Sequence, residues 1–344
     1  MTWMIYGAYG YTGELVAQYA KERGKQPLLA GRNETKLKAV ADRLELPYRV
    51  VDLNDKQGLT AALKDVELVV HCAGPFEVTA QPMIDACLQT QTHYLDITGE
   101  LAVFELAHSH DAEAKKAGVV LCPGVGFDVI PTDCVAAQLK QKLPDATALK
   151  LGFESLSRMS RGTAKTSVRR LGEGGAVRRS GTIVNVPLAY RTQRVDFGNG
   201  EKLAMTIPWG DVSTAFYTTG IPDIEVYIPA SPNLVKRLKR MNYFRWLLRF
   251  NWVKNMLEKK IEQQPAGPNE EQLEKAITYV WGEARNAEGK VVTVREKVMN
   301  GYKLTSRGAV DVALHVISNK PEGGYFTPAN LCGAELIDRY RIKD

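Results

Sequence analysis

The stretch that decides the fold lies at the amino terminus and reads Thr2-Trp3-Met4-Ile5-Tyr6-Gly7-Ala8-Tyr9-Gly10-Tyr11-Thr12-Gly13. Its first five residues are mostly apolar and typical of a buried strand, and apolar residues recur at helical spacing over 12–23. The three glycines, in the pattern GxxGxxG, therefore stand in the turn between a strand and a helix. Such a turn lets backbone N–H groups and a helix N-terminus approach a phosphate without a Cβ in the way. The stretch predicts a site for a dinucleotide pyrophosphate, with a purely structural turn as the alternative.

Short apolar runs then alternate with helical patterns as far as residue 122. The spacing predicts strands at 2–6, 27–30, 48–51, 67–71, 93–97 and 119–122, and helices at 12–23, 34–44, 56–63, 81–90 and 101–117. Six strands separated by helices predict an α/β fold with a Rossmann-type, doubly wound parallel sheet.

The pattern changes after residue 126. Strands or hairpin arms are predicted at 147–154, 182–196, 202–207, 213–217 and 223–228, and a hairpin joins 277–285 to 290–298. This predicts a second α+β domain built on a largely antiparallel sheet. We therefore expect a dinucleotide-binding domain over 1–127 and a second domain over 128–305. The helices predicted within 306–344, at 306–318 and 328–340, are expected to pack back on the first domain.

Composition excludes several classes of protein. Hydrophobic residues make up 44% of the 344 residues and charged residues 24%, which fits a globular chain and not a disordered or collagen-like one. The five cysteines are scattered and form no CxxC pair, so neither a disulfide framework nor a thiolate zinc site is indicated. With no leader pattern at the start and no apolar run of about 18 residues, we expect a cytoplasmic protein.

The second predicted strand is followed by residues that favour one dinucleotide over another. An NAD site usually has a carboxylate here, whereas this chain has Gly31, Arg32 and Asn33. The Arg32 guanidinium suits a ribose 2′-phosphate, and Lys36 and Lys38 add positive potential in the next turn. The sequence therefore predicts NADP(H) as cofactor, with a solvated surface arginine as the alternative.

Two further loops complete the predicted cofactor site. Asp52 follows the third strand, where it could bind the adenine amino group or cap the strand end. Small residues over 72–75, after the fourth strand, allow close approach of the backbone to the ribose and nicotinamide. The predicted cofactor-binding residues are Gly7, Tyr9, Gly10, Tyr11, Thr12, Gly13, Gly31, Arg32, Asn33, Asp52, Cys72, Ala73, Gly74 and Pro75.

The sequence lacks the residues that several other reaction classes require. None of the 14 tyrosines has a lysine four positions on, which excludes the Tyr-x-x-x-Lys chemistry of short-chain dehydrogenases. The histidines at 108 and 110 are two residues apart and would face different sides of a helix, so no metal site is predicted. No GxSxG motif, P-loop lysine or nucleic-acid-binding module is present.

Three later segments carry a resemblance to a family. Residues 91–100 (QTHYLDITGE), 126–133 (GFDVIPTD) and 324–329 (GYFTPA), together with the glycine turn, resemble the motifs of the saccharopine dehydrogenase-like oxidoreductases, and most of all their trans-acting enoyl reductase type. The sequence departs from the motif mildly, at Val129 and Thr132. The resemblance implies a Rossmann lobe, a second α+β lobe, and reduction of a C=N or C=C bond by NADPH.

Within these segments, Tyr94 and Asp128 are the catalytic candidates. A reductase of this kind needs a proton donor beside the hydride donor, and either side chain could serve. A core role for Tyr94 and a helix-capping role for Asp128 are the structural alternatives. The predicted substrate-binding residues are Glu100, Arg161, Thr163 and Lys165, of which the basic ones could hold a carboxylate or phosphate or simply face solvent.

The formal net charge of +6 is unevenly distributed. Residues 233–260 hold nine basic residues and one acid, residues 158–179 hold seven and one, and the rest of the chain carries a net charge of −8. A basic amphipathic helix is predicted over 232–260. Its aromatic and apolar side could lie in an anionic lipid interface or pack on the second domain, and both alternatives stay open.

The leading hypothesis is therefore an NADP(H)-dependent oxidoreductase that reduces a C=C or C=N bond of a hydrophobic or acyl-type small molecule. The competing hypothesis is a non-catalytic NADPH-binding sensor or lipid-surface scaffold. We expect no nucleic-acid partner. Contact of 233–260 with a membrane surface, and assembly as a homodimer, are left open.

Overall fold

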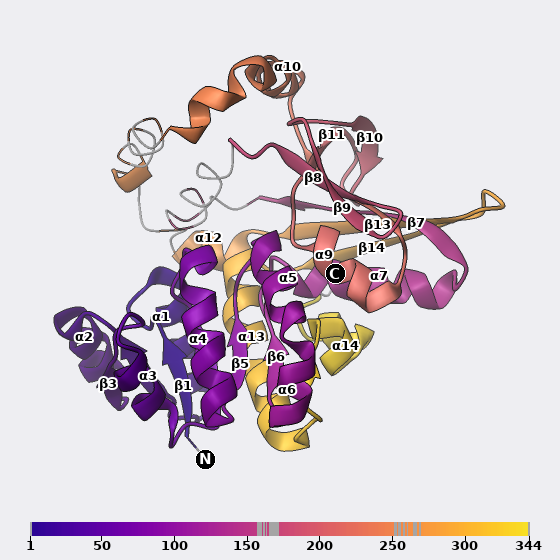
Figure 1. Ribbon diagram of the computed structural model, residues 1–344. Coiled ribbons are helices and arrows are strands. Elements are labelled where there is room, and N and C mark those ends of the chain that lie inside the picture. The colour runs from indigo at the N-terminus through magenta and orange to yellow at the C-terminus, as the bar shows by residue number, and fades with distance from the viewer. Residues whose placement is uncertain are drawn as a thin grey trace. The chain divides into compact units, whose positions relative to one another are not determined.

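The computed structural model describes residues 2–156, 160, 162, 164, 172–250, 253, 256, 259, 261–263, 267 and 270–342 (Figure 1). The chain forms two compact units. The first comprises Met1–Ile130 and Gly301–Gly333, and the second comprises Pro131–Asn300 and Ala334–Asp344. These boundaries differ from the predicted ones, since the first unit extends to Ile130 and the last eleven residues belong to the second unit.

The first unit is built on a seven-stranded parallel sheet with helices on both faces (Figure 1). Its strands, in their order across the sheet, are β15 (Gly324–Tyr325), β6 (Val120–Cys122), β5 (His93–Asp96), β4 (Leu68–His71), β1 (Trp3–Tyr6), β2 (Leu28–Gly31) and β3 (Tyr48–Val50). This confirms the predicted doubly wound sheet. The order reverses between β1 and β4, and in open α/β sheets ligands bind beyond the carboxyl ends of the strands at such a point.

Most helices of the first unit begin and end close to the predicted positions. The helices are α1 (Tyr11–Glu22), α2 (Glu34–Leu44), α3 (Lys56–Leu63), α4 (Phe76–Thr90), α5 (Leu101–Ser109), α6 (Asp111–Ala117), α13 (Gly301–Asn319) and α14 (Pro328–Cys332). Of these, α4 and α13 each begin five residues earlier than predicted. The single helix predicted over 101–117 was wrong, because the backbone at His110 leaves helical geometry and separates α5 from α6. Helix α13 packs on α1, where Arg23 and Asp311 form an ion pair of 3.0 Å.

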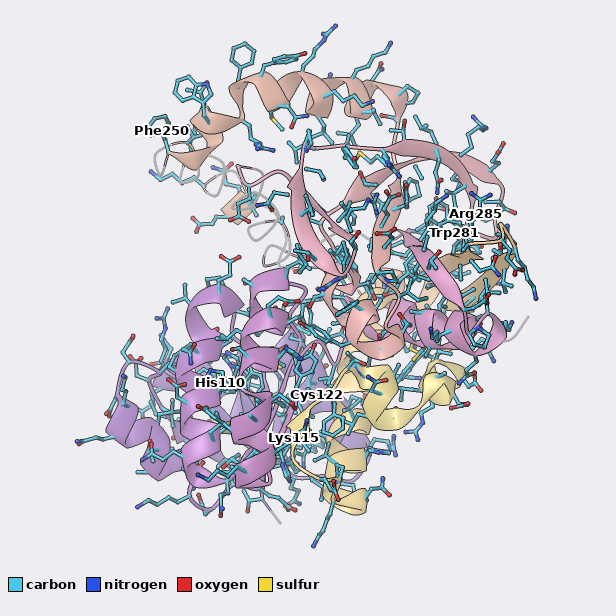
Figure 2. All side chains as sticks on the ribbon, turned by 45° about the vertical axis from the view of Figure 1, so that its right-hand side comes forward. His110, Lys115, Cys122, Phe250, Trp281 and Arg285 are labelled. Carbon is cyan, nitrogen blue, oxygen red and sulfur yellow. The ribbon has the colours of Figure 1, made fainter. Side chains whose placement is uncertain are left out.

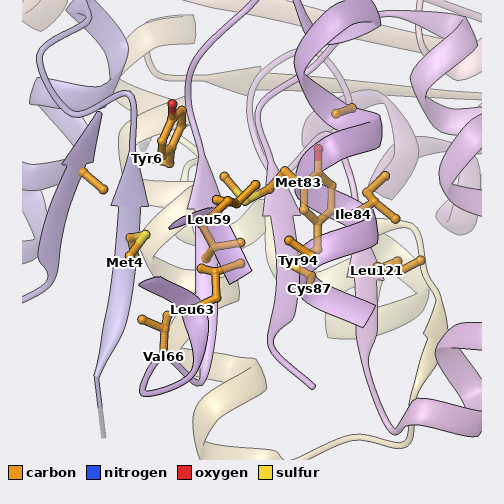
Figure 3. Packing of buried hydrophobic residues seen from close by; sticks show 14 of the residues in the cluster. Met4, Tyr6, Leu59, Leu63, Val66, Met83, Ile84, Cys87, Tyr94 and Leu121 are labelled. Atoms are coloured by element: carbon orange, nitrogen blue, oxygen red, sulfur yellow. The ribbon is translucent and has the colours of Figure 1, made fainter. Parts of the chain in front are cut away.

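The core of this sheet is continuous from β1 to β6. Met4 and Tyr6 of β1, Leu59 of α3, Met83 of α4 and Tyr94 of β5 belong to one cluster of buried residues (Figure 3). Strand residues that face helices on both sides of a sheet are buried throughout, and all four residues of β1, β2 and β4 are buried.

The second unit is built on an eight-stranded mixed sheet. Its strands are β7 (Ala146–Ser155), β8 (Gly175–Arg179), β9 (Thr182–Val186), β10 (Thr192–Asp196), β11 (Glu201–Ile207), β12 (Asp223–Pro229), β13 (Thr278–Asn286) and β14 (Val291–Val298). The main path runs β10-β11-β12-β7-β13-β14, with β8 and β9 attached beside β12. Among the strands that the structure describes in this unit, only β12 and β7 pair in parallel, so the predicted largely antiparallel sheet is confirmed.

The helices of the second unit differ from the predicted elements at several points. They are α7 (Ile130–Lys142), α9 (Asp211–Thr219), α10 (Pro232–Met241), η1 (Asn242–Arg249), α12 (Glu270–Lys275) and η2 (Ala334–Arg339). The strand predicted at 213–217 is part of α9. This helix is buried around most of its surface, so it lacks the polar face that marks an amphipathic helix in a sequence.

Three other predicted elements are divided. The segment 182–196 forms β9 and β10, and the helix predicted at 328–340 forms α14 and η2. The long helix predicted over 232–260 ends at Met241 and continues as the 3₁₀ helix η1 to Arg249, and most of 251–260 lies outside the described residues. Within the part of the chain that the structure describes, no helix has the length and the apolar run that a membrane crossing requires.

Candidate functional site

The glycine turn between β1 and α1 needs Gly7 and Gly13 for steric reasons. Gly7 has φ +83°, which favours glycine, and a Cβ there would come within 2.8 Å of the Ala73 backbone nitrogen. A Cβ on Gly13 would overlap the carbonyl oxygen of Gly7. Gly10 is the N-cap of α1 and offers no side chain to cap it. The turn therefore brings the first turn of a helix close to the carboxyl end of β1 with its backbone uncovered.

The side chains in this turn have packing roles. The ring of Tyr9 lies over Gly31, where a Cβ would be 2.5 Å from the ring. Tyr11 is half-buried and meets the edge of the Tyr302 ring at 5.4 Å, and burial raises the pKa of Tyr11 to about 12. Thr12 is half-buried in the first turn of α1. The turn is thus braced against the end of β2 and the start of α13.

The residues after β2 and β3 divide between exposed charge and local capping. Arg32 is exposed, and within the described residues it makes no hydrogen bond or ion pair, so its guanidinium is available to a ligand. Asn33 caps α2, since its side chain accepts from the Lys36 N–H at 3.0 Å. Asp52 accepts from the N–H of Asn54 at 2.9 Å. This is the capping alternative for Asp52, and its contact with adenine stays a prediction.

The loop after β4 is held by a chain of hydrogen bonds that could not be predicted from the sequence. His71 is completely buried, and its Nε2 lies 3.0 Å from the Thr79 hydroxyl oxygen. That hydroxyl donates to the Ala73 carbonyl at 2.7 Å. Burial lowers the pKa of His71 to about 3, so the ring stays neutral, and burial also raises the pKa of the Cys72 thiol. These hydrogen bonds fix the 72–75 loop beside Gly7. The Gly74–Pro75 peptide in this loop is cis.

Glu100, predicted to bind substrate, caps a helix instead of facing solvent. Its side chain is buried, with one carboxylate oxygen accepting from the Phe76 N–H at 3.1 Å and the other from the Glu77 N–H at 2.7 Å. These are the first two residues of α4, whose N-cap Pro75 has no side-chain cap. An anion at a helix N-terminus is stabilised by the helix dipole, so the geometry gives Glu100 a structural role. Binding of substrate by Glu100 stays a prediction.

Tyr94 and Asp96 form a closed pair at the end of β5. Tyr94 has no solvent exposure, and its hydroxyl donates to Asp96 Oδ2 at 2.6 Å. Asp96 Oδ1 accepts from the N–H groups of Thr98 and Gly124, each at 2.9 Å. Burial raises the pKa of Asp96 to about 6, and the pKa of Tyr94 is raised well above its usual value, first by burial and then by Asp96. The arrangement matches the core alternative for Tyr94.

Asp128, in the loop after β6, has different surroundings. It is half-buried, and among the described residues its carboxyl makes no hydrogen bond or ion pair, so the predicted helix-capping alternative is not observed. One of its oxygens lies so close to Gly99 that a Cβ there would be 2.7 Å away. Burial, and then the nearby Glu100 carboxylate, raise the pKa of Asp128 to about 7. This carboxyl can gain or lose a proton near neutral pH.

The remaining predicted substrate-binding residues, Arg161, Thr163 and Lys165, lie outside the described residues. The site that the structure describes therefore lies within the first unit. It joins the glycine turn, the exposed Arg32, the loop after β4 and the carboxyl of Asp128, all beyond the carboxyl ends of parallel strands.

The fold and these loops define a dinucleotide-binding domain of the Rossmann type. Residues 3–122 match the family model of the saccharopine dehydrogenase NADP binding domain, so this part of the chain is similar to the NADP-binding domain of that family. The resemblance and the cofactor predicted from the sequence are confirmed. The glycine cradle and Arg32 fit the group, since they offer uncovered backbone to the pyrophosphate and a free guanidinium to the 2′-phosphate.

Relatives extend the similarity beyond this domain. A saccharopine dehydrogenase-like oxidoreductase of Mus musculus is 26% identical over 203 residues, which are 51% of this chain and 47% of that protein. A trans-acting enoyl reductase of Mycobacterium ulcerans (strain Agy99) is 31% identical over 141 residues, 38% of this chain and 33% of that protein. The matched part of the chain thus spans half or less of the length of these curated relatives.

One solved structure shares the fold along nearly the whole chain. Apo saccharopine dehydrogenase (L-Glu forming) from Saccharomyces cerevisiae has a TM-score of 0.65 at 11% identity, covering 98% of this chain and 97% of that chain. The likeness confirms the predicted fold class, with a Rossmann-type sheet and a second, mixed sheet.

Proposed function

We propose that the protein is an NADP(H)-dependent oxidoreductase that reduces a polarised C=C or C=N bond in a hydrophobic or acyl-type substrate. The observation that carries the proposal is the Asp128 carboxyl, which is half-buried, without a partner among the described residues, and placed after β6 in the NADP-binding unit. A reductase needs such a group, because the atom of the double bond that does not receive hydride must receive a proton.

The roles divide between cofactor and chain. When bound, NADPH supplies a hydride to one atom of the double bond. Asp128 in its protonated form donates a proton to the other atom and is protonated again by solvent. Glu100 stays fixed on the N-terminus of α4, where its charge favours the protonated form of Asp128. The loop after β4, held by Thr79, orients the cofactor.

Tyr94 is the weaker candidate for the proton donor. Its hydroxyl is completely buried and already donates to Asp96. A proton donor must come within hydrogen-bonding distance of the substrate, and a side chain without solvent exposure reaches it only after rearrangement. We therefore assign Tyr94 a positioning role, through Asp96, on the loops at 98 and 124.

The test measures NADPH absorbance with a panel of α,β-unsaturated acyl thioesters and cyclic imines. We expect turnover with one of these classes and a fall in kcat of about 100-fold in Asp128→Asn, within the range typical of general acid catalysis. The NADPH Kd should stay within about twofold of the wild type. Because the protonated carboxyl is the active form, wild-type kcat should fall as pH rises through about 7.

Tyr94→Phe serves as the matched control, because it removes the other candidate hydroxyl and should keep most of the turnover. Full turnover by Asp128→Asn would remove Asp128 from the mechanism. Tight NADPH binding with no consumption on any substrate class would contradict the enzyme and favour the NADPH-binding sensor.

A further inference from the structure

The segment formed by α10, η1 and Phe250 carries exposed charge and exposed aromatic rings together. Its inner side is anchored, since Val235 is 7% exposed in a cluster with Ala189 and Met205. Asn242 exchanges two hydrogen bonds with the backbone of Leu188, at 2.9 and 3.1 Å. The inner apolar residues of the segment therefore pack on the rest of the second unit. Packing of this kind is one of the two alternatives that the sequence left open.

The outer side remains apolar. Tyr243 is 81% exposed, Phe244 62%, Trp246 58% and Phe250 46%. Among the described residues, seven of the fourteen exposed large apolar side chains fall within 234–256, so this is a concentration and not the usual scatter. In Figure 2, aromatic rings project from the ribbon of this segment, and Phe250 is labelled at its end. The rings of Trp246 and Phe250 meet edge to face at 6.0 Å.

The same segment is uniformly basic. Lys236, Arg237, Lys239 and Arg240 are on α10, and none forms an ion pair within the described part of the chain. Residues 233–250 contain no Asp or Glu. We define these four cations, together with Tyr243, Phe244, Trp246 and Phe250, as the basic aromatic surface.

This combination fits one kind of partner. Trp and Tyr side chains favour the headgroup region of a bilayer, because an apolar ring and a polar tip are both accommodated there. Lysine and arginine next to them are attracted to anionic headgroups. A protein interface typically has few charges at its apolar centre, whereas here four exposed cations of α10 directly precede the exposed rings in the chain.

We propose that the basic aromatic surface binds the face of an anionic lipid bilayer, with its rings in the headgroup region and its cations at the lipid phosphates. The contact would bring the chain to a surface where hydrophobic or acyl substrates collect. Lipid binding itself does not depend on the proposed reaction, and vesicle sedimentation, which tests it, measures no turnover.

The test is sedimentation of the full chain with phosphatidylcholine vesicles, with and without about 30% phosphatidylglycerol. We expect pelleting that needs phosphatidylglycerol and weakens with added salt. The double variant Phe244→Ser, Trp246→Ser should bind at least tenfold more weakly, and so should Lys236→Glu, Arg237→Glu. The matched controls are Tyr48→Ser, Val291→Ser and Lys142→Glu, Lys290→Glu, which change exposed residues elsewhere and should bind like the wild type.

A second measurement locates the rings. Brominated lipid should quench tryptophan fluorescence of the wild type, and Trp246→Phe should keep binding but lose most of that quenching. The absence of pelleting with anionic vesicles would overturn the proposal, as would equal binding by the Phe244→Ser, Trp246→Ser variant and its control. A vesicle-free dimer that this variant abolishes in analytical ultracentrifugation would assign the surface to a second copy of the chain and likewise overturn it.

Discussion

Asp96 ends β5 and Asp128 follows β6, the neighbouring strand of the same sheet, yet their surroundings are opposite. Asp96 has no solvent exposure and accepts three hydrogen bonds, from the Tyr94 hydroxyl and the N–H groups of Thr98 and Gly124. Asp128 is half-buried and accepts none within the described residues. The donors around a carboxyl, and not its place on the sheet, therefore decide whether it holds loops together or is free to exchange a proton.

The largest effect is expected for Asp96→Ala. The substitution leaves three buried donors without an acceptor, and each such donor costs about 1–3 kcal/mol. Allowing for partial rearrangement, we expect the free energy of unfolding to fall by about 4 kcal/mol. Urea unfolding of the full chain measures this loss of stability. The transition to follow is the one that added NADP shifts to a higher urea concentration.

Asp52→Ala is the control for this prediction, because Asp52 is exposed and caps only its own turn. It should cost less than about 1 kcal/mol. If Asp96→Ala cost no more than this control, Asp96 would not hold the loops at 98 and 124.

Asp128→Asn should have a smaller effect on stability, and one that depends on pH. Between its ordinary pKa and about 7, Asp128 is protonated in the folded chain and ionised in the unfolded chain. Folding then takes up a proton, so the contribution of Asp128 to stability falls as pH rises and is lost above about pH 7. We expect Asp128→Asn to gain about 2 kcal/mol relative to the wild type between about pH 5 and pH 8, which allows for solvent screening of a half-buried group.

The measurement is the difference between the two unfolding curves at each pH. Taking the difference matters because Asp96 and His71, whose pKa values are about 6 and about 3, are present in both proteins and cancel. A difference that stays constant with pH would show that the carboxyl of Asp128 has its ordinary pKa.

Local signals explain which parts of the fold the sequence predicts well. The predicted bounds of α2 and α3 agree with the structure at both ends, because Asn33 and Asp55 cap them within three residues. Strand β15 was missed, since two residues give no periodic pattern and it is held by pairing with β6, about two hundred residues away. Helix α9 was mistaken for a strand because burial on several sides hid its helical period.

The candidate site shows the same division. The glycine turn and Arg32 could be found from sequence, since their chemistry depends on neighbours along the chain. The capping of α4 by Glu100 could not, because the Phe76 N–H belongs to a residue 24 positions earlier. Nor could the sequence distinguish Asp96 from Asp128, since the donors that occupy Asp96 include Gly124, 28 residues away.

The smallest expected effect is that of Gly99→Ala. The backbone of Gly99 does not need glycine, since its φ lies outside the left-handed region, but the added Cβ would lie 2.7 Å from Asp128 Oδ2 and turn that carboxyl aside. We expect kcat on a substrate that the wild type reduces to fall about fivefold, which is about 1 kcal/mol, with little change in unfolding. Because both substitutions act through one carboxyl, adding Gly99→Ala to Asp128→Asn should cause no further loss. Losses that simply multiply in the double variant would show that Gly99 acts on another group, and would remove this support for Asp128 as the proton donor.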